Sequence, residues 1–546
     1  MPATKVLMVH PRFNPGSFWN YIRSCEVAGA KYPAPPLGLI TVAAMLPSDW
    51  EVRLVDRNTT DLTDADIAWA DMVMTGGMLP QQFDTLHVIA WAQRLGKPVV
   101  VGGPDPTSSP QAYDRADFLV LGEVEGIMSH FLAAWAAGER RGTFTAEKFK
   151  ADVTSTPVPR YDLLKLSDYT NLSLQFSRGC PFTCEFCDII ELYGRVPRTK
   201  NTAQVLAELD ALLARGYRGH VDFVDDNLVG NKKALKAFLP ELIAWQQRHG
   251  YPFEFSTEAS INLADDTELL DLLRQANFFL IFIGIESPDP ETLRLMQKKQ
   301  NTRRSIPDSV HRVQKAGIVV IGGFIVGFDN EKAGVGDGIV QLIEDSAIPV
   351  AMAGLLYALP NTQLSRRLER EGRLHPGGDV VNSKGLLGDQ CTSGLNFDTK
   401  RPRVEVLADY REVVARAYTP EAFFGRLRRT ALNLGLKGPG GRIALRDLPR
   451  DIGRFARVAL ALTRAGRGER REFWGLIATL LRRNPRALKP AITVAALYLH
   501  LGPFSRYVLE TIDHQIEDVR SGRWQPPVPV PVLPEAPATP ETATAA

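Results

Sequence analysis

Short apolar runs alternate with amphipathic stretches through the first quarter of the chain. The runs are KVLMVH (5–10), MVMTGG (72–77), PVVVGG (98–103) and DFLVLGE (117–123), and they have the continuous apolar character of strands buried on both faces. Helical patterns such as FDTLHVIAWAQRLG (83–96) lie between them. Repeated alternation of strand and helix predicts a doubly wound parallel sheet over residues 1–140.

A second block of the same alternation covers residues 170–400, after a polar segment, 141–169, that we interpret as a linker. Its strand candidates are SLQFSRG, HVDFVDD, FEFSTEA, FLIFIGIES, VVIGGFIVG and VAMAGLLYAL, separated by helical patterns such as AQVLAELDALLARG. Six such units predict a partial (β/α)6 barrel, which stays open where eight units would close.

The pattern becomes helical and basic over residues 401–525. Between 421 and 484 the chain holds 15 Lys and Arg against five Asp and Glu. An ordinary helical domain with a solvated basic face is the favoured interpretation, and peripheral contact of these helices with a membrane surface is the alternative. The Pro- and Ala-rich end, 526–546, is expected to be disordered.

Bulk composition excludes several classes of protein. The 546 residues carry 64 Lys and Arg against 62 Asp and Glu, so no global attraction to nucleic acid is expected. The apolar run near the N-terminus is far shorter than the core of a signal peptide. We therefore expect a cytoplasmic protein, with membrane association as the alternative that the basic helices leave open.

Three of the five cysteines fall within eight residues. Cys180, Cys184 and Cys187 have the spacing CxxxCxxC. Iron–sulfur clusters are normally held by four thiolates, so three cysteines on one loop leave one iron of a [4Fe-4S] cluster open to another ligand. Structural zinc is the less favoured alternative, because it uses paired CxxC spacings and four protein ligands.

This loop resembles the hallmark of the radical S-adenosylmethionine (SAM) superfamily, in which an aromatic residue precedes the last cysteine, as Phe186 does here. The resemblance implies that the open iron binds SAM, whose cleavage gives a radical able to take hydrogen from unactivated carbon. It also implies SAM contacts at the ends of successive barrel strands. The predicted contacts are Phe186, Asp225, Asp226, Asn227, Glu258, Ser260 and Glu286. Acidic residues at strand ends also cap helices, which is the alternative for each one.

The first domain lacks the GxGxxG that follows the first strand of a dinucleotide-binding fold. A flavodoxin-like domain directly before such a barrel resembles the cobalamin-dependent radical SAM class, including the hopanoid C-2 methylase group. The resemblance implies cobalamin contacts in the glycine-rich loops, at Gly76, Gly77, Met78, Gly102, Gly103, Pro104, Ser108, Gly122 and Glu123. No Asp-x-His-x-x-Gly is present, so no histidine is evident as the lower ligand of cobalt, and a domain that binds no cofactor remains the alternative.

Aromatic residues near these motifs have two interpretations. Trp19, Tyr21, Tyr32, Tyr193 and Tyr357 could line a corrin or substrate cavity, although packing is the more frequent role of such residues.

The resemblance implies methyl transfer to an unactivated carbon of a lipid or another apolar small molecule, with an electron donor such as ferredoxin or flavodoxin. Two rivals share the same motifs: a cobalamin-dependent radical oxidoreductase or cyclase that does not methylate, and a cluster-containing sensor without turnover. In the enzymatic interpretations the cofactors carry the chemistry, so no protein nucleophile is required and no catalytic side chain is predicted.

Overall fold

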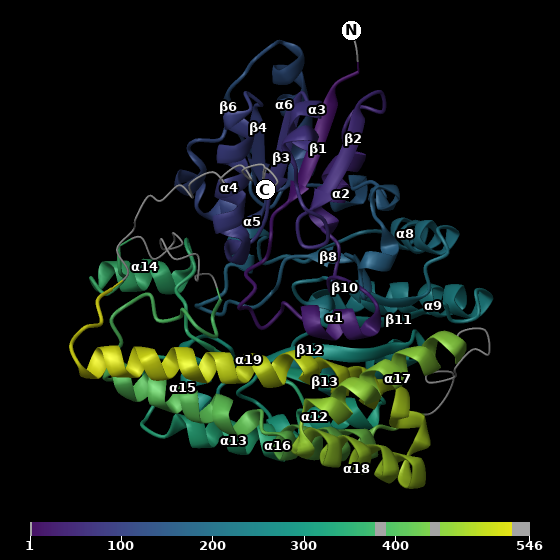
Figure 1. The fold of residues 1–546 in the computed structure, drawn as a ribbon, viewed down its shortest axis with the longest axis vertical. Helices are drawn as coiled ribbons and strands as arrows, with labels where there is room; N and C mark the ends of the chain where they lie inside the picture. The colour runs from purple at the N-terminus through teal and green to yellow at the C-terminus, as the bar shows by residue number, and fades with distance from the viewer. Residues whose placement is uncertain (1–2, 377–388, 437–447, 527–546) are drawn as a thin grey trace, which may run out of the picture.

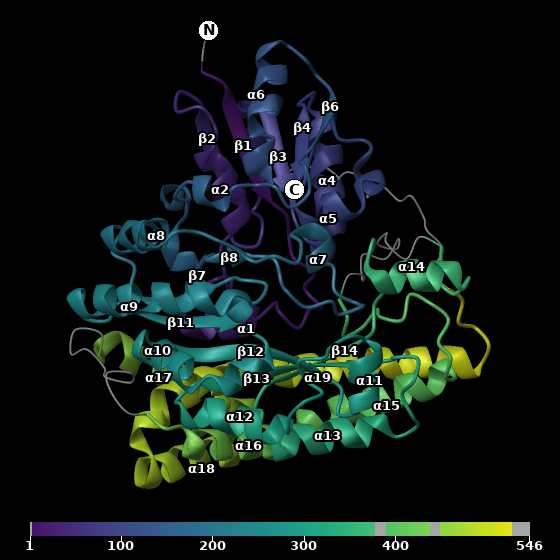
Figure 2. The ribbon, with the colours of Figure 1, turned by 180° about the vertical axis from the view of Figure 1, so that it is seen from behind.

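The computed structural model describes residues 3–376, 389–436 and 448–526, so nearly all of the predicted disordered tail lies outside it. The described residues form three layers (Figure 1). One parallel sheet lies at the top, a second sheet crosses the middle, and the long C-terminal helices run along the bottom, as the reverse view in Figure 2 also shows.

The first sheet has six parallel strands in the order β2-β1-β3-β4-β5-β6. They are β1 (Lys5–His10), β2 (Glu51–Asp56), β3 (Met72–Gly76), β4 (Val99–Gly102), β5 (Phe118–Leu121) and β6 (Gly142–Thr145). Helices α3 (Asp64–Trp69) and α4 (Gln82–Arg94) cover one face, while α2 (Leu37–Ala44) and α6 (Met128–Ala136) cover the other. The predicted doubly wound sheet is confirmed, and β6 falls in the segment predicted to be a linker.

The second sheet is also parallel, in the order β14-β13-β12-β11-β10-β7. Its strands are β7 (Asn171–Leu174), β10 (Gly219–Phe223), β11 (Phe253–Glu258), β12 (Phe278–Glu286), β13 (Val319–Val326) and β14 (Ala351–Leu355). Helices such as α8 (Thr202–Ala214) and α9 (Lys232–Arg248) connect successive strands, and asparagine side chains cap both at the N-terminus. The predicted partial barrel is confirmed.

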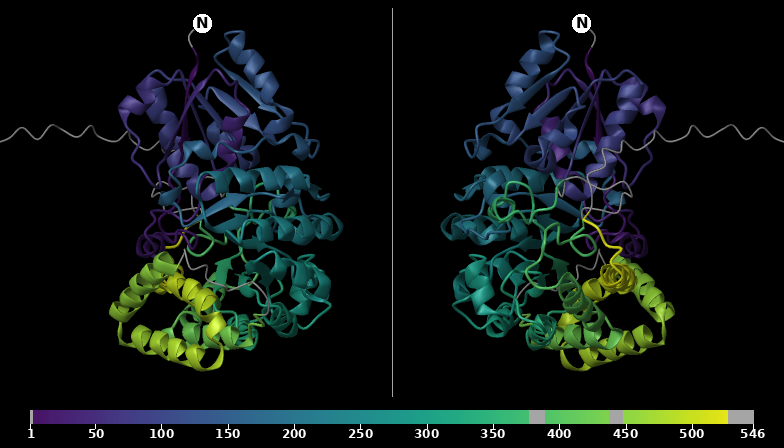
Figure 3. Two further views of the ribbon diagram at one scale, coloured as in Figure 1. Left: turned by 90° about the vertical axis from the view of Figure 1, so that its right-hand side faces the viewer. Right: turned by 90° about the vertical axis from the view of Figure 1, so that its left-hand side faces the viewer.

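The C-terminal helices are α15 (Arg403–Ala417), α16 (Pro420–Asn433), α17 (Leu448–Ala465), α18 (Arg467–Arg483) and α19 (Leu488–Arg520). They pack beside the barrel as one layer (Figure 3). The longest apolar stretch of the chain lies in α19, where Val494, Tyr498 and Leu501 are buried. No helix among the described residues is both long and apolar enough to cross a membrane.

A large cavity lies where the layers meet. It has a volume of about 1570 Å³, above the roughly 300–1,000 Å³ of ordinary small-molecule pockets. Its walls come from the carboxyl ends of β1, β3, β4 and β5, from the inner face of β10–β12, and from α17, α18 and α19. Carboxyl ends of strands around a switch in strand order are the usual place for a ligand in a doubly wound sheet.

Candidate active site

The cysteine loop is closed at its base by a short ladder. β8 (Ser177–Arg178) pairs antiparallel with β9 (Arg198–Thr199), and the cysteines lie between them. Gly179 has φ +95°, and a Cβ there would come within 2.9 Å of the Gly194 carbonyl oxygen. Only glycine fits this turn without strain. The backbone conformation at Gly179 therefore fixes the position of Cys180, the first of the three cysteines.

All three cysteines are free thiols, with Cys184 buried and the other two half-buried. Among the described residues, no three His, Cys, Asp or Glu side chains converge to hold a single metal ion. Thiolates that each bind a different iron of a multi-iron cluster need no such convergence. The donor set therefore fits a cluster with three protein thiolates.

Two amide side chains from other parts of the barrel domain donate to these sulfurs. The Asn227 Nδ2 lies 3.6 Å from the Cys180 Sγ, and the Gln300 Nε2 lies 3.8 Å from the Cys184 Sγ. Hydrogen bonds to sulfur tune the reduction potential of iron–sulfur clusters. Asn227 was predicted as a site residue, whereas Gln300 has no local motif and lies more than a hundred residues from the loop.

Asp225 and Asp226 are bonded to the backbone of the cysteine loop. Asp225 accepts hydrogen bonds from the Phe176 and Ser177 amides at 2.8 and 2.7 Å, and Asp226 accepts one from the Gly179 amide at 2.8 Å. Burial raises the pKa of Asp225 to about 7 and that of Asp226 to about 6. Both were predicted to contact SAM, and in the structure both carboxylates hold the loop in place.

The other predicted SAM contacts form three groups. Ser260 donates its backbone amide to the Asn227 Oδ1 at 3.0 Å, which joins it to Cys180. Glu286, at φ +71°, pairs with the Lys298 Nζ at 2.5 Å. Lys298 also lies 5.8 Å from the centre of the Phe186 ring, so it links Phe186 to Glu286. Sequence reasoning missed Lys298.

Glu258 alone of these residues lines the cavity. Its side chain is open to the cavity, and no hydrogen bond or ion pair is formed by its carboxylate within the described residues. Burial and the neighbouring carboxylates of Asp222, Asp226 and Asp225 raise the pKa of Glu258 to about 8. The raised pKa favours the protonated form of this carboxyl group.

The glycine loops of the first sheet form a cradle at the top of the cavity. A Cβ on Gly76 would lie 1.8 Å from the Gly102 carbonyl oxygen, and one on Gly77 would lie 2.6 Å from the Gln81 Oε1. Gly103 has φ +106°. These loops have room for backbone only, which fits close approach to a large flat cofactor.

Most residues predicted to contact cobalamin lie at this cradle. The cavity is lined by Gly76, Gly77, Met78, Gly102, Gly103, Pro104, Gly122 and Glu123. Ser108 does not line it, and its carbonyl accepts a hydrogen bond from the Asn361 Nδ2 at 2.6 Å. His10, at the end of β1, does line it, with its Nε2 3.3 Å from the Gln81 Nε2.

Ion pairs join the cradle to the cysteine loop. Arg178 contacts Glu123 at 3.3 Å and Glu125 at 2.7 Å, and Arg198 contacts Glu123 at 2.8 Å. Burial raises the pKa of Glu125, but hydrogen bonds from Arg178 and its charge outweigh that effect and hold the pKa below its usual value. This network links β5 of the first sheet to β8 and β9.

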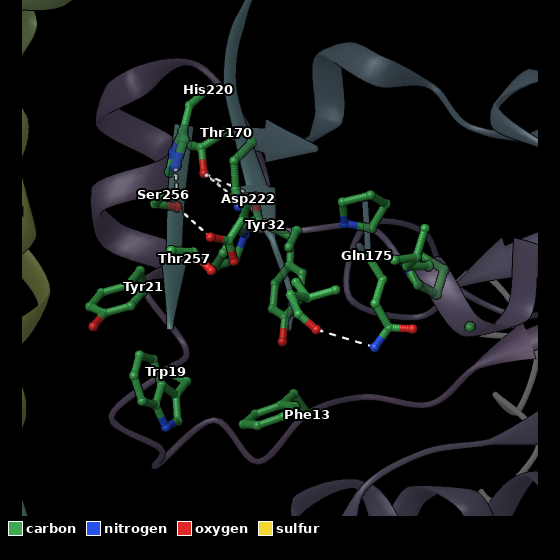
Figure 4. Close-up of a pocket in the computed structure, with 18 of the residues that line it drawn as sticks. Phe13, Trp19, Tyr21, Tyr32, Thr170, Gln175, His220, Asp222, Ser256 and Thr257 are labelled. Atoms are coloured by element: carbon green, nitrogen blue, oxygen red, sulfur yellow. Dashed lines mark hydrogen bonds between the residues drawn. The ribbon is translucent and has the colours of Figure 1, made fainter. Parts of the chain in front are cut away.

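Aromatic side chains line the middle of the cavity (Figure 4). Trp19, Tyr21, Tyr32 and Tyr193 lie on its wall, whereas Tyr357 does not. The lining interpretation therefore holds for four of the five aromatic residues considered from sequence.

Three family models match successive parts of the chain. The B12 binding domain matches residues 24–132, the radical SAM superfamily matches 174–335, and a domain of unknown function matches 362–514. An uncharacterized methyltransferase of Synechocystis sp. is 44% identical over 97% of each chain. The hopanoid C-2 methylase of Rhodopseudomonas palustris is 39% identical over 78% of this chain and 79% of its own.

Solved structures show the same fold. The cobalamin-dependent SAM radical enzyme OxsB superimposes with a TM-score of 0.57 and 15% identity, covering 95% of this chain and 81% of that one. The radical SAM methyltransferase TsrM from Kitasatospora setae gives 0.51 and 17%, covering 69% and 76%. The two relatives at 44% and 39% identity, with the matched B12-binding and radical SAM domains, show that the chain belongs to the cobalamin-dependent radical SAM methyltransferases.

Proposed function

We propose that this enzyme transfers a methyl group to an unactivated carbon of a lipid or another apolar metabolite. The observation that carries the proposal is the cavity, because one continuous space joins the glycine cradle to the inner face of the barrel. When bound, the [4Fe-4S] cluster and SAM supply a radical that takes hydrogen from carbon, and cobalamin supplies the methyl group. The protein positions these partners and excludes water.

The proposed roles of the residues follow their contacts. Cys180, Cys184 and Cys187 hold the cluster. The predicted SAM contacts, Phe186, Asn227, Glu258, Ser260 and Glu286, surround SAM together with Lys298, while Asp225 and Asp226 fix the loop. The glycine cradle holds cobalamin. In this scheme residues 1–140 bind cobalamin, 170–400 perform the radical step, and 401–525 form a helical domain beside the barrel.

A lipid is the proposed substrate class for two reasons. The relative with 39% identity is named as a methylase of hopanoids. The wall of the cavity in the C-terminal layer is mostly apolar, with Phe455, Ile477 and Ile492 among its side chains. Binding against an apolar wall is favourable when the ligand also has apolar surface, because both surfaces are then removed from water.

The proposal also includes two partners. The enzyme contacts an anionic membrane peripherally, and ferredoxin or flavodoxin reduces it. Large apolar side chains are exposed on α17 and α18, and Arg482 and Arg483 are exposed beside Leu481. Apolar side chains flanked by cations are typical of surfaces that lie on anionic bilayers. Flotation with anionic liposomes at low salt, lost at high salt, is the expected result, and no flotation at low salt would remove this contact.

The test of methylation uses the reconstituted enzyme under anaerobic conditions with SAM and a strong reductant. Both nucleoside products are quantified by mass spectrometry, with and without cobalamin. We expect 5'-deoxyadenosine together with cobalamin-dependent S-adenosylhomocysteine. Deoxyadenosine alone would favour the non-methylating oxidoreductase, and the absence of both products would favour the sensor.

A further inference from the structure

The lower arm of the cavity lies between the barrel and the C-terminal layer. Side chains from all three helices α17, α18 and α19 form one of its walls. Most are apolar, among them Phe455, Val458, Ile477, Leu488, Ile492 and Leu497, and the polar ones are Asp451, Arg454, Lys489 and Thr493. The arm is continuous with the space below the glycine cradle. A molecule lying in this arm would therefore reach the site where the two cofactors meet.

Apolar side chains lie at the mouth of the arm, beside the exposed Arg454 of α17. Ile452 on α17 and Trp474 and Leu481 on α18 line the cavity and are also exposed at the surface. Leu460 on α17 is exposed to the same extent, 50% against 56% for Ile452, but does not line the cavity. Exposed apolar side chains at the rim of a cavity mark a binding route for an apolar ligand.

The facing wall, on β10 and β11, is polar. The His220 Nε2 lies 2.6 Å from the Ser256 hydroxyl, and that hydroxyl donates to one carboxylate oxygen of Asp222 (Figure 4). The other oxygen of Asp222 accepts no hydrogen bond from any described residue, although Asp222 lines the cavity. This oxygen is an open acceptor facing an apolar wall.

An ion pair holds the two walls together. The Lys489 Nζ on α19 lies 2.7 Å from the Glu254 carboxylate on β11.

Burial lowers the pKa of His220, so its imidazole is neutral near pH 7 and does not neutralise Asp222. The arm thus offers mostly apolar surface on one side and, on the other, the Asp222 carboxylate near the carboxyl group of Glu258.

We propose that this arm is the substrate channel, and that it takes a long apolar molecule whose hydroxyl group donates to Asp222. The inference rests on the proposed function and adds the route of binding and the polar group that is recognised. A carboxylate has no proton to donate and would be repelled by Asp222. A charged amine would lose its hydration among the apolar side chains of the arm, so an uncharged hydroxyl fits best.

The mouth is tested with the neutral apolar dye N-phenyl-1-naphthylamine and the reconstituted holoenzyme. Ile452→Glu places a charge at the mouth and should weaken dye binding about tenfold. Leu460→Glu, on the same helix and equally exposed, should leave binding unchanged. Equal effects of the two variants, or no dye binding by the unmodified enzyme, would overturn the channel.

The acceptor is tested by displacing the dye with dodecan-1-ol or dodecane. The alcohol should displace it at about fivefold lower concentration, as expected for one hydrogen bond. Asp222→Leu should remove this preference, and Asp222→Asn, which keeps the shape and a weaker acceptor, should reduce it. Equal displacement by alcohol and alkane in the unmodified enzyme would refute recognition of the hydroxyl.

These readouts are separate from methylation. Dye binding does not depend on SAM cleavage, so a preparation that binds the dye as expected but yields no S-adenosylhomocysteine would refute methyl transfer and keep the channel. The opposite result would refute the channel and keep methyl transfer.

Discussion

The two parallel sheets face each other across one cavity but prepare their cofactor sites by different means. The first sheet offers backbone, because at Gly76 and Gly102 a Cβ would collide with a neighbouring carbonyl oxygen. The barrel offers side chains, with Asn227 and Gln300 donating to cysteine sulfurs and Asp225 holding the loop. Adding one methyl group to a glycine should therefore disrupt the first site. The second site should be disrupted when the polar or thiol group of a side chain is removed.

The largest expected effect separates the two sites completely. Cys180→Ala, Cys184→Ala and Cys187→Ala each remove a proposed thiolate ligand, so the cluster and all detectable 5'-deoxyadenosine should be lost. Cobalamin binding should persist, because the glycine cradle belongs to the other sheet. Iron content, nucleoside products and cobalamin absorbance measure the three effects. Deoxyadenosine production by any of these variants would contradict the assignment of the loop.

The reciprocal change is Gly76→Ala. Its Cβ would lie 1.8 Å from the Gly102 carbonyl oxygen, so the two loops must separate and cobalamin affinity should fall about tenfold or more. SAM cleavage should continue. Gly126→Ala, in the same domain but with no atom within 4 Å of the added methyl, is the matched control. Equal cobalamin affinity in both variants would refute the cradle.

The link between the sheets can be cut at Arg178. Arg178→Met leaves Glu125 without its ion-pair partner in a site where the glutamate side chain is only 2% exposed, which should cost about 3–5 kcal/mol of unfolding free energy. Arg160→Met breaks the exposed pair with Asp162 and should cost about 0–1 kcal/mol. Denaturant unfolding of the two variants measures the difference. Similar losses would mean that the network does not join the layers.

The contrast between a backbone site and a side-chain site also explains which features could be predicted from the sequence. Strands such as β1 and β4 are continuous apolar runs, and the glycines directly follow them, so the fold and the cradle are local signals. The strand β6, with the sequence GTFT, is short and half polar and had no such signal. Lys298 and Gln300 reach the cysteine loop only through the folded barrel, so no spacing in the sequence indicates them.

Two residues with opposite pKa shifts on β11 give the smallest but most specific test. The pKa of Glu258 is raised to about 8, so between about pH 4.5 and 8 the folded protein binds a proton that the unfolded chain does not. Stability should therefore fall as pH rises through this window. Glu258→Gln should remove the part of the fall that Glu258 causes, while the raised pKa values of Asp225 and Asp226 maintain the rest.

Glu254, four residues earlier on the same strand, provides the control. Burial raises its pKa, but the ion pair with Lys489 outweighs burial and lowers the pKa below its usual value. Its contribution to stability is therefore present at neutral pH and lost only as pH falls through that lowered pKa. Glu254→Gln should leave the decline toward pH 8 unchanged and remove part of the decline in acid. If both variants changed the same limb of the stability profile, the two carboxylates would share one environment, and the contrast between an open acid and a paired one on this strand would be wrong.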